Sequence, residues 1–125
     1  MSDIKVELSE QFALKIVECY NFLCREKKEF TMSKQLLRSG TSIGANIAES
    51  LYAESDADFI HKLKIAQKEA SETRFWLKIV FRSGYLPESQ YESLKKDCNS
   101  LLRIISSIIR SMIEKISHEQ SLQNL

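Results

Sequence analysis

The apolar residues of the chain recur with a helical period over nearly its whole length. In the first segment the apolar positions are Phe12, Ile16, Cys19 and Leu23, at steps of four, three and four residues. Such steps place side chains on one face of an α-helix, whereas a half-buried strand needs steps of two. The pattern predicts a helix over about residues 9–28, with Ser9 as its N-cap.

A second helix is predicted over about residues 33–53. Its apolar stripe consists of Leu36, Gly40, Ile43, Ile47 and Leu51. The glycines at 40 and 44 are unusual, because each costs about 1 kcal/mol relative to alanine inside a helix. Either another helix approaches closely there, or the helix breaks near residues 39–41. We favour the continuous helix.

The third and fourth segments have the most regular pattern. Apolar or small residues alternate at steps of four and three from Phe59 to Gly84, and again from Tyr91 to Met112. This heptad spacing is typical of helices that pack at about +20° in bundles. It predicts helices over about residues 56–84 and 88–117, followed by a frayed polar tail over residues 118–125.

Four helices of similar length with short connections fold with neighbouring helices antiparallel. The predicted fold class is therefore all-α, an up-down-up-down four-helix bundle. The chain has 125 residues, which is the size of one domain. With only three glycines and one proline, the sequence is unlike β-sandwiches and collagen-like chains, which need many turns or repeated glycines.

The third predicted helix also carries apolar side chains away from its seam. These are Ile65, Phe75, Trp76 and Ile79. Either the helix is buried over a wide arc within the chain, or this second apolar face packs on another copy of the chain. We favour the second copy, because aromatic side chains are enriched at interfaces and symmetric homo-oligomers are common.

Cationic side chains lie beside these apolar positions on the same helix. They are Lys64, Lys68, Lys78 and Arg82. Four cations on one helix face can contact phosphates, and an oligomer would repeat the set. The other interpretation is a solvated face on which Glu69 and Glu72 neutralise the lysines, and from these residues alone we favour the solvated face. The net charge of the chain is only +1, so it indicates no general affinity for polyanions.

No catalytic or metal site is predicted. Asp58 and His61 have the carboxylate-x-x-His spacing of di-iron bundles, but they point away from the seam of their helix. Glu114 and His118 likewise point away from the seam of the fourth helix. Glycine-rich phosphate-binding motifs are absent from the sequence. We therefore expect a protein that is not an enzyme and that needs no cofactor.

The cysteines and the hydropathy of the chain bear on its compartment. Cys19, Cys24 and Cys98 have no spacing typical of a disulfide framework or a metal site, so we expect buried, reduced thiols. The first residues lack the apolar segment of a secretory signal, and no stretch reaches the ~18 apolar residues of a membrane span. We expect a cytoplasmic protein with no contact with a membrane.

The segment over residues 35–50, QLLRSGTSIGANIAES, resembles the signature of a bacterial family of four-helix bundle proteins. The members are also called 23S rRNA intervening-sequence proteins or S23 ribosomal proteins. The similarity continues through residues 58–63, 68–73 and 75–77. The resemblance implies a cytoplasmic homopentamer. It also implies a relation to the accessory variability protein of diversity-generating retroelements, a basic pentamer that binds a reverse transcriptase and nucleic acid.

No catalytic residue is implied by this resemblance. It does imply that Gly44 and Ala48 lie at a close helix contact, with Asn46 and Glu49 as polar contacts nearby. We therefore expect a non-enzymatic homo-oligomer that acts as an accessory protein associated with RNA or a ribonucleoprotein. Its expected partners are copies of itself and RNA, DNA or a nucleic-acid enzyme. The alternative is a protein-binding or structural assembly module without affinity for nucleic acid.

Overall fold

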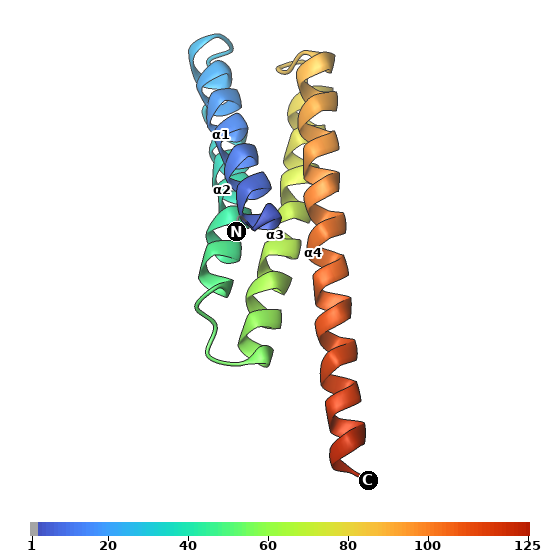
Figure 1. Ribbon diagram of the computed structural model, residues 1–125. Helices are drawn as coiled ribbons and strands as arrows, with labels where there is room; N and C mark the ends of the chain where they lie inside the picture. The colour runs from blue at the N-terminus through green and yellow to red at the C-terminus, as the bar shows by residue number, and fades with distance from the viewer. Residues whose placement is uncertain (1–2) are drawn as a thin grey trace.

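The computed structural model describes residues 3–125 and contains four α-helices. They are α1 (Ile4–Arg25), α2 (Met32–Ser50), α3 (Asp56–Arg82) and α4 (Glu88–Gln123). The helices run alternately up and down and are joined by short loops (Figure 1). Each helix packs on the next one in the chain, and α1 also packs on α4. The predicted antiparallel four-helix bundle is confirmed.

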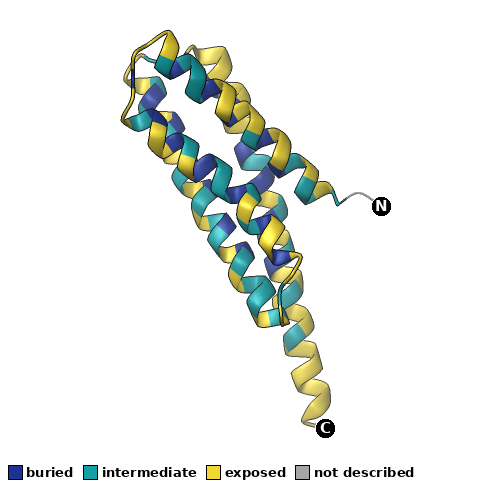
Figure 2. Ribbon diagram, turned by 90° about the vertical axis from the view of Figure 1, so that its left-hand side faces the viewer, coloured by how far each residue is buried: buried dark blue, intermediate teal, exposed yellow. Residues whose placement is uncertain are grey.

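The helix ends differ most from the predicted ones at the start of α1 and the end of α4, while α1 and α2 each end three residues earlier than predicted. α1 begins at Ile4, because the Asp3 side chain accepts a hydrogen bond from the backbone N–H of Lys5 (3.2 Å) and caps the helix. Ser9 is not a cap but a buried residue inside α1, where its hydroxyl donates to the carbonyl of Val6 (2.9 Å). At the other end, α4 stays helical to Gln123, and this last part extends past the bundle with exposed side chains (Figure 2).

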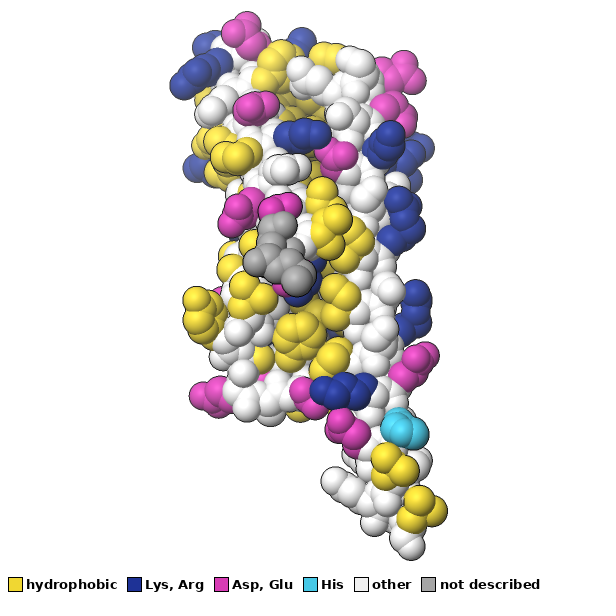
Figure 3. All heavy atoms as spheres, in the orientation of Figure 1, with side chains coloured by type: hydrophobic (Ala, Val, Ile, Leu, Met, Phe, Trp, Pro, Cys, Tyr) yellow, Lys and Arg dark blue, Asp and Glu magenta, His cyan; other side chains and the backbone are white. Residues whose placement is uncertain are grey.

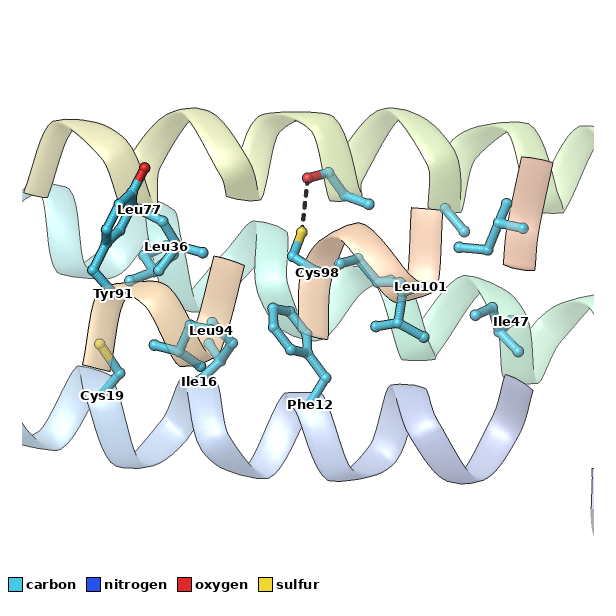
Figure 4. Close-up of a cluster of buried hydrophobic side chains, with 14 of the residues drawn as sticks. Phe12, Ile16, Cys19, Leu36, Ile47, Leu77, Tyr91, Leu94, Cys98 and Leu101 are labelled. Atoms are coloured by element: carbon cyan, nitrogen blue, oxygen red, sulfur yellow. Dashed lines mark hydrogen bonds between the residues drawn. The ribbon is translucent and has the colours of Figure 1, made fainter. Parts of the chain in front are cut away.

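The core consists of the apolar stripes that the spacing predicts. Its largest fully buried side chains include Phe12, Ile16, Leu23, Leu36, Ile43, Ile47, Leu63, Leu77, Leu101 and Ile105. Labelled members of this set point from all four helices into the space between them (Figure 4). Each such side chain contributes about 1.5–3 kcal/mol relative to an exposed position.

Small side chains lie at the contact between α3 and α4. Ala66, Ala70 and Thr73 are fully buried along α3. Opposite them, the Cys98 thiol of α4 donates a hydrogen bond to the backbone carbonyl of Ala70 at 3.3 Å (Figure 4, dashed line). A short side chain reaches the backbone of another helix only where the two helices lie close together. The small residues therefore allow α4 to approach α3 closely.

The three cysteines are free thiols. Burial raises the pKa of the Cys19 thiol to about 11 and that of the Cys98 thiol to about 12. Both stay protonated at neutral pH, as expected of thiols with a structural role. Cys24 differs from the prediction because it is only half-buried, with its sulfur 3.8 Å from the hydroxyl oxygen of Ser33.

The two glycines of α2 face α1, and the helix continues through both. A Cβ atom added to Gly40 would lie 2.8 Å from Cγ1 of Ile16, whose side chain is fully buried. A Cβ atom added to Gly44 would lie 3.4 Å from the nearest atoms of Ser9. The first distance is a clash and the second is nearly an ordinary contact. Of the two glycines, Gly40 therefore lies at the tighter contact between α1 and α2.

A buried carboxylate caps the N-terminus of α2. One oxygen of Glu29 accepts hydrogen bonds from the backbone N–H groups of Thr31 (3.0 Å) and Met32 (2.9 Å), and the other accepts from Ser33 (2.7 Å). Burial alone would raise the pKa of the Glu29 carboxyl, but the hydrogen bonds from Met32, Ser33 and Thr31 outweigh it and lower the pKa. The cap thus depends on the ionised form of Glu29.

Substitution of Gly40 tests the tight contact between α1 and α2. Overpacking costs about 1–3 kcal/mol, and alanine recovers about 1 kcal/mol of helix propensity. We expect Gly40→Ala to lower the free energy of unfolding by up to about 2 kcal/mol, measured by urea denaturation, and to be less stable than Gly44→Ala. Gly44→Ala is the matched control and should leave stability unchanged or raise it. Equal stability of the two variants would contradict the tight contact at Gly40.

The Glu29 cap predicts a pH-dependent stability difference. At pH 7 we expect Glu29→Gln to be less stable than the wild type by about 1–2 kcal/mol, because a neutral amide caps more weakly than a carboxylate. Since the folded-state pKa lies below the ordinary value of 4.5, the contribution is complete above that pH and is lost as the pH falls below it. Urea denaturation at pH 7, 5 and 3 should therefore show a narrowing gap. A gap that is constant with pH would count against the cap.

Candidate functional site

A groove runs along the outer junction of α3 and α4. Its first part, of about 520 Å³, is lined by Phe75 and Tyr91 together with cationic and polar side chains. Its second part, of about 660 Å³, shares Arg74 and Asn99 with the first, so the two parts are continuous. We call this groove the basic groove, because its lining includes six cationic residues: Arg74, Lys78, Arg82, Lys95, Arg103 and Arg110.

The charge of the basic groove is not neutralised by the part of the chain that the structure describes. Its lining contains no carboxylate, and none of its six cations forms an ion pair with any of residues 3–125. Arg74 donates a hydrogen bond to the side-chain oxygen of Asn99 (3.2 Å), which is neutral. Asp97, which lies between Lys95 and Asn99 on α4, is paired with Lys15 of α1 (2.6 Å) and does not line the groove, and neither do Glu88 and Glu92. A positive field therefore extends along the groove.

The register of α3 against α4 brings these cations together. Gln67 of α3 donates a hydrogen bond to the hydroxyl of Ser106 on α4 (2.9 Å). Two turns later on α3, Arg74 donates to Asn99, which lies two turns earlier on the antiparallel α4. On α4, the stretch from Lys95 to Arg110 covers about 22 Å at 1.5 Å per residue. Figure 3 shows Lys and Arg side chains in a column along the right-hand edge of the molecule, on the side of α4. The groove is long enough for several successive phosphates.

The sequence prediction found part of this site. Lys78 and Arg82 line the basic groove as members of the predicted cationic face. Lys64 and Lys68 are exposed on the same helix but do not line the groove. Arg74 and the three cations of α4 were missed, because a pattern on one helix does not reveal which residues of another helix lie opposite. Aligning the heptad positions of α3 and α4 in antiparallel order would have placed these cations opposite each other.

The acidic residues expected to neutralise the lysines are engaged elsewhere. Arg38 of α2 forms ion pairs with Glu69 (3.2 Å) and with Glu72 on the α2-facing side of α3. The same carboxylate of Glu72 accepts a hydrogen bond from the indole N–H of Trp76 (3.0 Å). The α2–α3 side of the bundle is thus neutralised, whereas the α3–α4 side remains cationic.

The four apolar residues predicted to form an oligomer surface do not share one environment. Ile65, Trp76 and Ile79 are half-buried, and Trp76 packs against the core of its own chain. Wide burial within the chain therefore accounts for part of the pattern. Phe75 is the exception, since it is 53% exposed and lines the basic groove.

The residues of the predicted family motif lie on α2. Gly44 faces Ser9 of α1, and Asn46 donates a hydrogen bond to the carbonyl of Ser42 within α2 (2.9 Å). Ala48 is exposed, so the prediction of a close helix contact at this residue is corrected: the contact lies earlier in α2, where α1 crosses it. Glu49 is also exposed, 4.0 Å from the amine of Lys62.

Two other hollows are less distinctive in their chemistry. One, of about 320 Å³, lies between α1 and α4 beside Cys19 and Phe22, and another lies beside Phe59 and Met112 at the α2–α3 turn. Within residues 3–125, no group of three or more His, Cys, Asp or Glu side chains is placed to hold a metal ion. Nor does any helix in this range have an apolar stretch long enough to cross a membrane.

Comparisons with known proteins agree on one family. A family model described as 23S rRNA-intervening sequence protein matches residues 4–107. The chain is also similar to a crystal structure of a protein of unknown function from the S23 ribosomal protein family of Bacteroides thetaiotaomicron VPI-5482. The two are 52% identical, with a TM-score of 0.83, over 84% of this chain and 97% of the other. No curated protein matches the chain.

Proposed function

The chain belongs to the 23S rRNA-intervening sequence protein family, and we propose that it is a non-enzymatic accessory protein that binds RNA in the cytoplasm through its basic groove. The observation that supports this proposal is the set of six cations without ion-pair partners among residues 3–125. The name of the family favours RNA over DNA as the nucleic acid.

Local charge, not total charge, supports the binding of a polyanion. The whole chain has a net charge of only +1, but its acidic side chains lie outside the lining of the groove. Phosphates that contact the cations displace condensed counterions, so the affinity should fall steeply with salt. For a single strand that contacts all six cations, the logarithm of the binding constant should fall with the logarithm of the salt concentration at a slope of about 4.

We also propose that the protein works as a homo-oligomer. The half-buried side chains of Ile65, Trp76 and Ile79 leave apolar surface on α3 for a second copy to cover. Phe75 is not assigned to this interface here, because it lines the groove. Repetition of the groove in each subunit would raise the local positive potential and the effective concentration of binding sites.

The binding proposal predicts a defined effect of removing groove charges. We expect Lys78→Ala combined with Arg103→Ala to weaken binding of single-stranded RNA and to reduce the salt slope by about 1.4, or 0.7 for each lost contact. The matched control is Arg25→Ala combined with Lys34→Ala, which removes two exposed cations from α1 and α2. Fluorescence anisotropy at several salt concentrations measures both quantities.

Two results would count against RNA binding through the groove. One is a lack of binding at low salt, and the other is an equal loss of affinity in the groove variant and the control. A protein partner recovered after nuclease treatment, together with no affinity for RNA, would instead support the alternative of a protein-binding assembly module.

The oligomer proposal is tested by mass. Light scattering of the wild type should give several times the chain mass of 14.5 kDa. We expect Ile79→Glu to reduce this mass, because a carboxylate at a buried contact between copies is costly to desolvate. Ile79 suits this test better than Trp76, which packs on the core of its own chain. Circular dichroism checks that the variant stays helical, and a wild-type mass of one chain would contradict the proposal.

A further inference from the structure

An exposed aromatic ring lies among the cations of the basic groove. The side chain of Phe75 is 53% exposed, although most aromatic rings of the chain are buried or half-buried. It lines the first part of the groove together with Lys78 of its own helix and Lys95 of α4. An apolar ring surrounded by positive charge and open to solvent suits a ligand that offers both a flat π-face and negative charge.

The structure holds this ring in a defined position. The rings of Phe75 and Trp76 form an edge-to-face pair, with centroids 5.0 Å apart and an interplanar angle of 76°. Trp76 is fixed by its hydrogen bond to Glu72, which is itself paired with Arg38 of α2. Because the two rings are far from parallel, Trp76 does not stack on the face of Phe75. Trp76 therefore contacts Phe75 without lying parallel to the Phe75 ring.

Tyr91, the other aromatic residue that lines the groove, already stacks on another ring of the chain. Tyr91 is buried and stacks on Phe81, with centroids 4.3 Å apart and an interplanar angle of 3°. The amine of Lys95 lies 5.6 Å from the centroid of the Tyr91 ring. Among the aromatic residues that line the basic groove, Phe75 is the one available to a ligand.

We propose that Phe75 stacks on an unpaired base of RNA while the cations of the basic groove hold the phosphates of the same strand, so that the groove prefers single-stranded RNA to a duplex. This inference rests on the proposed RNA binding. Bases in a duplex are stacked on each other, whereas an unpaired base can turn its π-face to an aromatic side chain. Lys78 follows Phe75 by one helical turn and Lys95 lies across the groove, so the backbone on either side of a stacked base meets a cation.

The test compares single-stranded RNA that carries one fluorescent 2-aminopurine with a duplex of the same sequence. We expect the wild type to bind the single strand more tightly and to change the 2-aminopurine emission. Phe75→Ala should weaken single-strand binding about 5- to 100-fold, in line with the loss of one stacked base. Its salt slope and its affinity for the duplex should not change, because no cation is lost.

Two control variants separate stacking from charge. Phe75→Tyr keeps the ring and should restore single-strand affinity and the emission change. Lys78→Ala keeps the ring but removes a phosphate contact, so it should lower the single-strand salt slope by about 0.7 and weaken the binding of both RNAs. Phe75 is largely exposed, so its substitutions should leave the bundle folded, which circular dichroism checks.

Three results would overturn the inference in distinguishable ways. Unchanged single-strand affinity in Phe75→Ala would remove the stacking role but leave RNA binding intact. A lower oligomer mass in Phe75→Ala would place the ring at a contact between copies instead. Failure of the wild type to bind either RNA would reject the proposed RNA binding itself, and the stacking role with it.

Discussion

The close approach of α3 and α4 determines the shape of the surface on which the proposed function depends. Ala66, Ala70 and Thr73 are small enough for α4 to lie against the backbone of α3, and the thiol of Cys98 reaches the carbonyl of Ala70. This contact fixes the register of the two antiparallel helices. Larger side chains on the α3 seam would separate the helices and widen the groove above them. The core packing and the spacing of the surface cations are thus consequences of the same contact.

The distribution of charge around the bundle follows from which helices face each other. On the α2–α3 side, Arg38 pairs with Glu69 and Glu72, so opposite charges neutralise one another. On the α3–α4 side, both helices contribute cations and the groove lining contains no acidic side chain. A nearly neutral chain can therefore present a strongly cationic groove. Total charge is a poor guide to such a surface, because it averages over sides with different partners.

Most of the fold could be predicted from the sequence, because the steps of three and four residues identify the buried face of each helix directly. The helix ends were harder to predict: Ser9 fits the sequence rule for an N-cap, but Asp3, six residues earlier, caps α1. The site was predicted in part, since Lys78 and Arg82 lie on one helix. Arg103 joins them only through the register of two helices, and the environment of Trp76 depends on how α2 packs beside it. Neither is encoded in the pattern of a single segment.

The central claim is that RNA lies along the α3–α4 junction, and photo-crosslinking tests it most directly. RNA that contains 4-thiouridine is irradiated with the full-length protein, and the crosslinked peptides are identified by mass spectrometry. The account predicts crosslinks within residues 71–82 and 91–110, on both sides of the basic groove. Crosslinks confined to α1 and α2, or none at low salt, would contradict it.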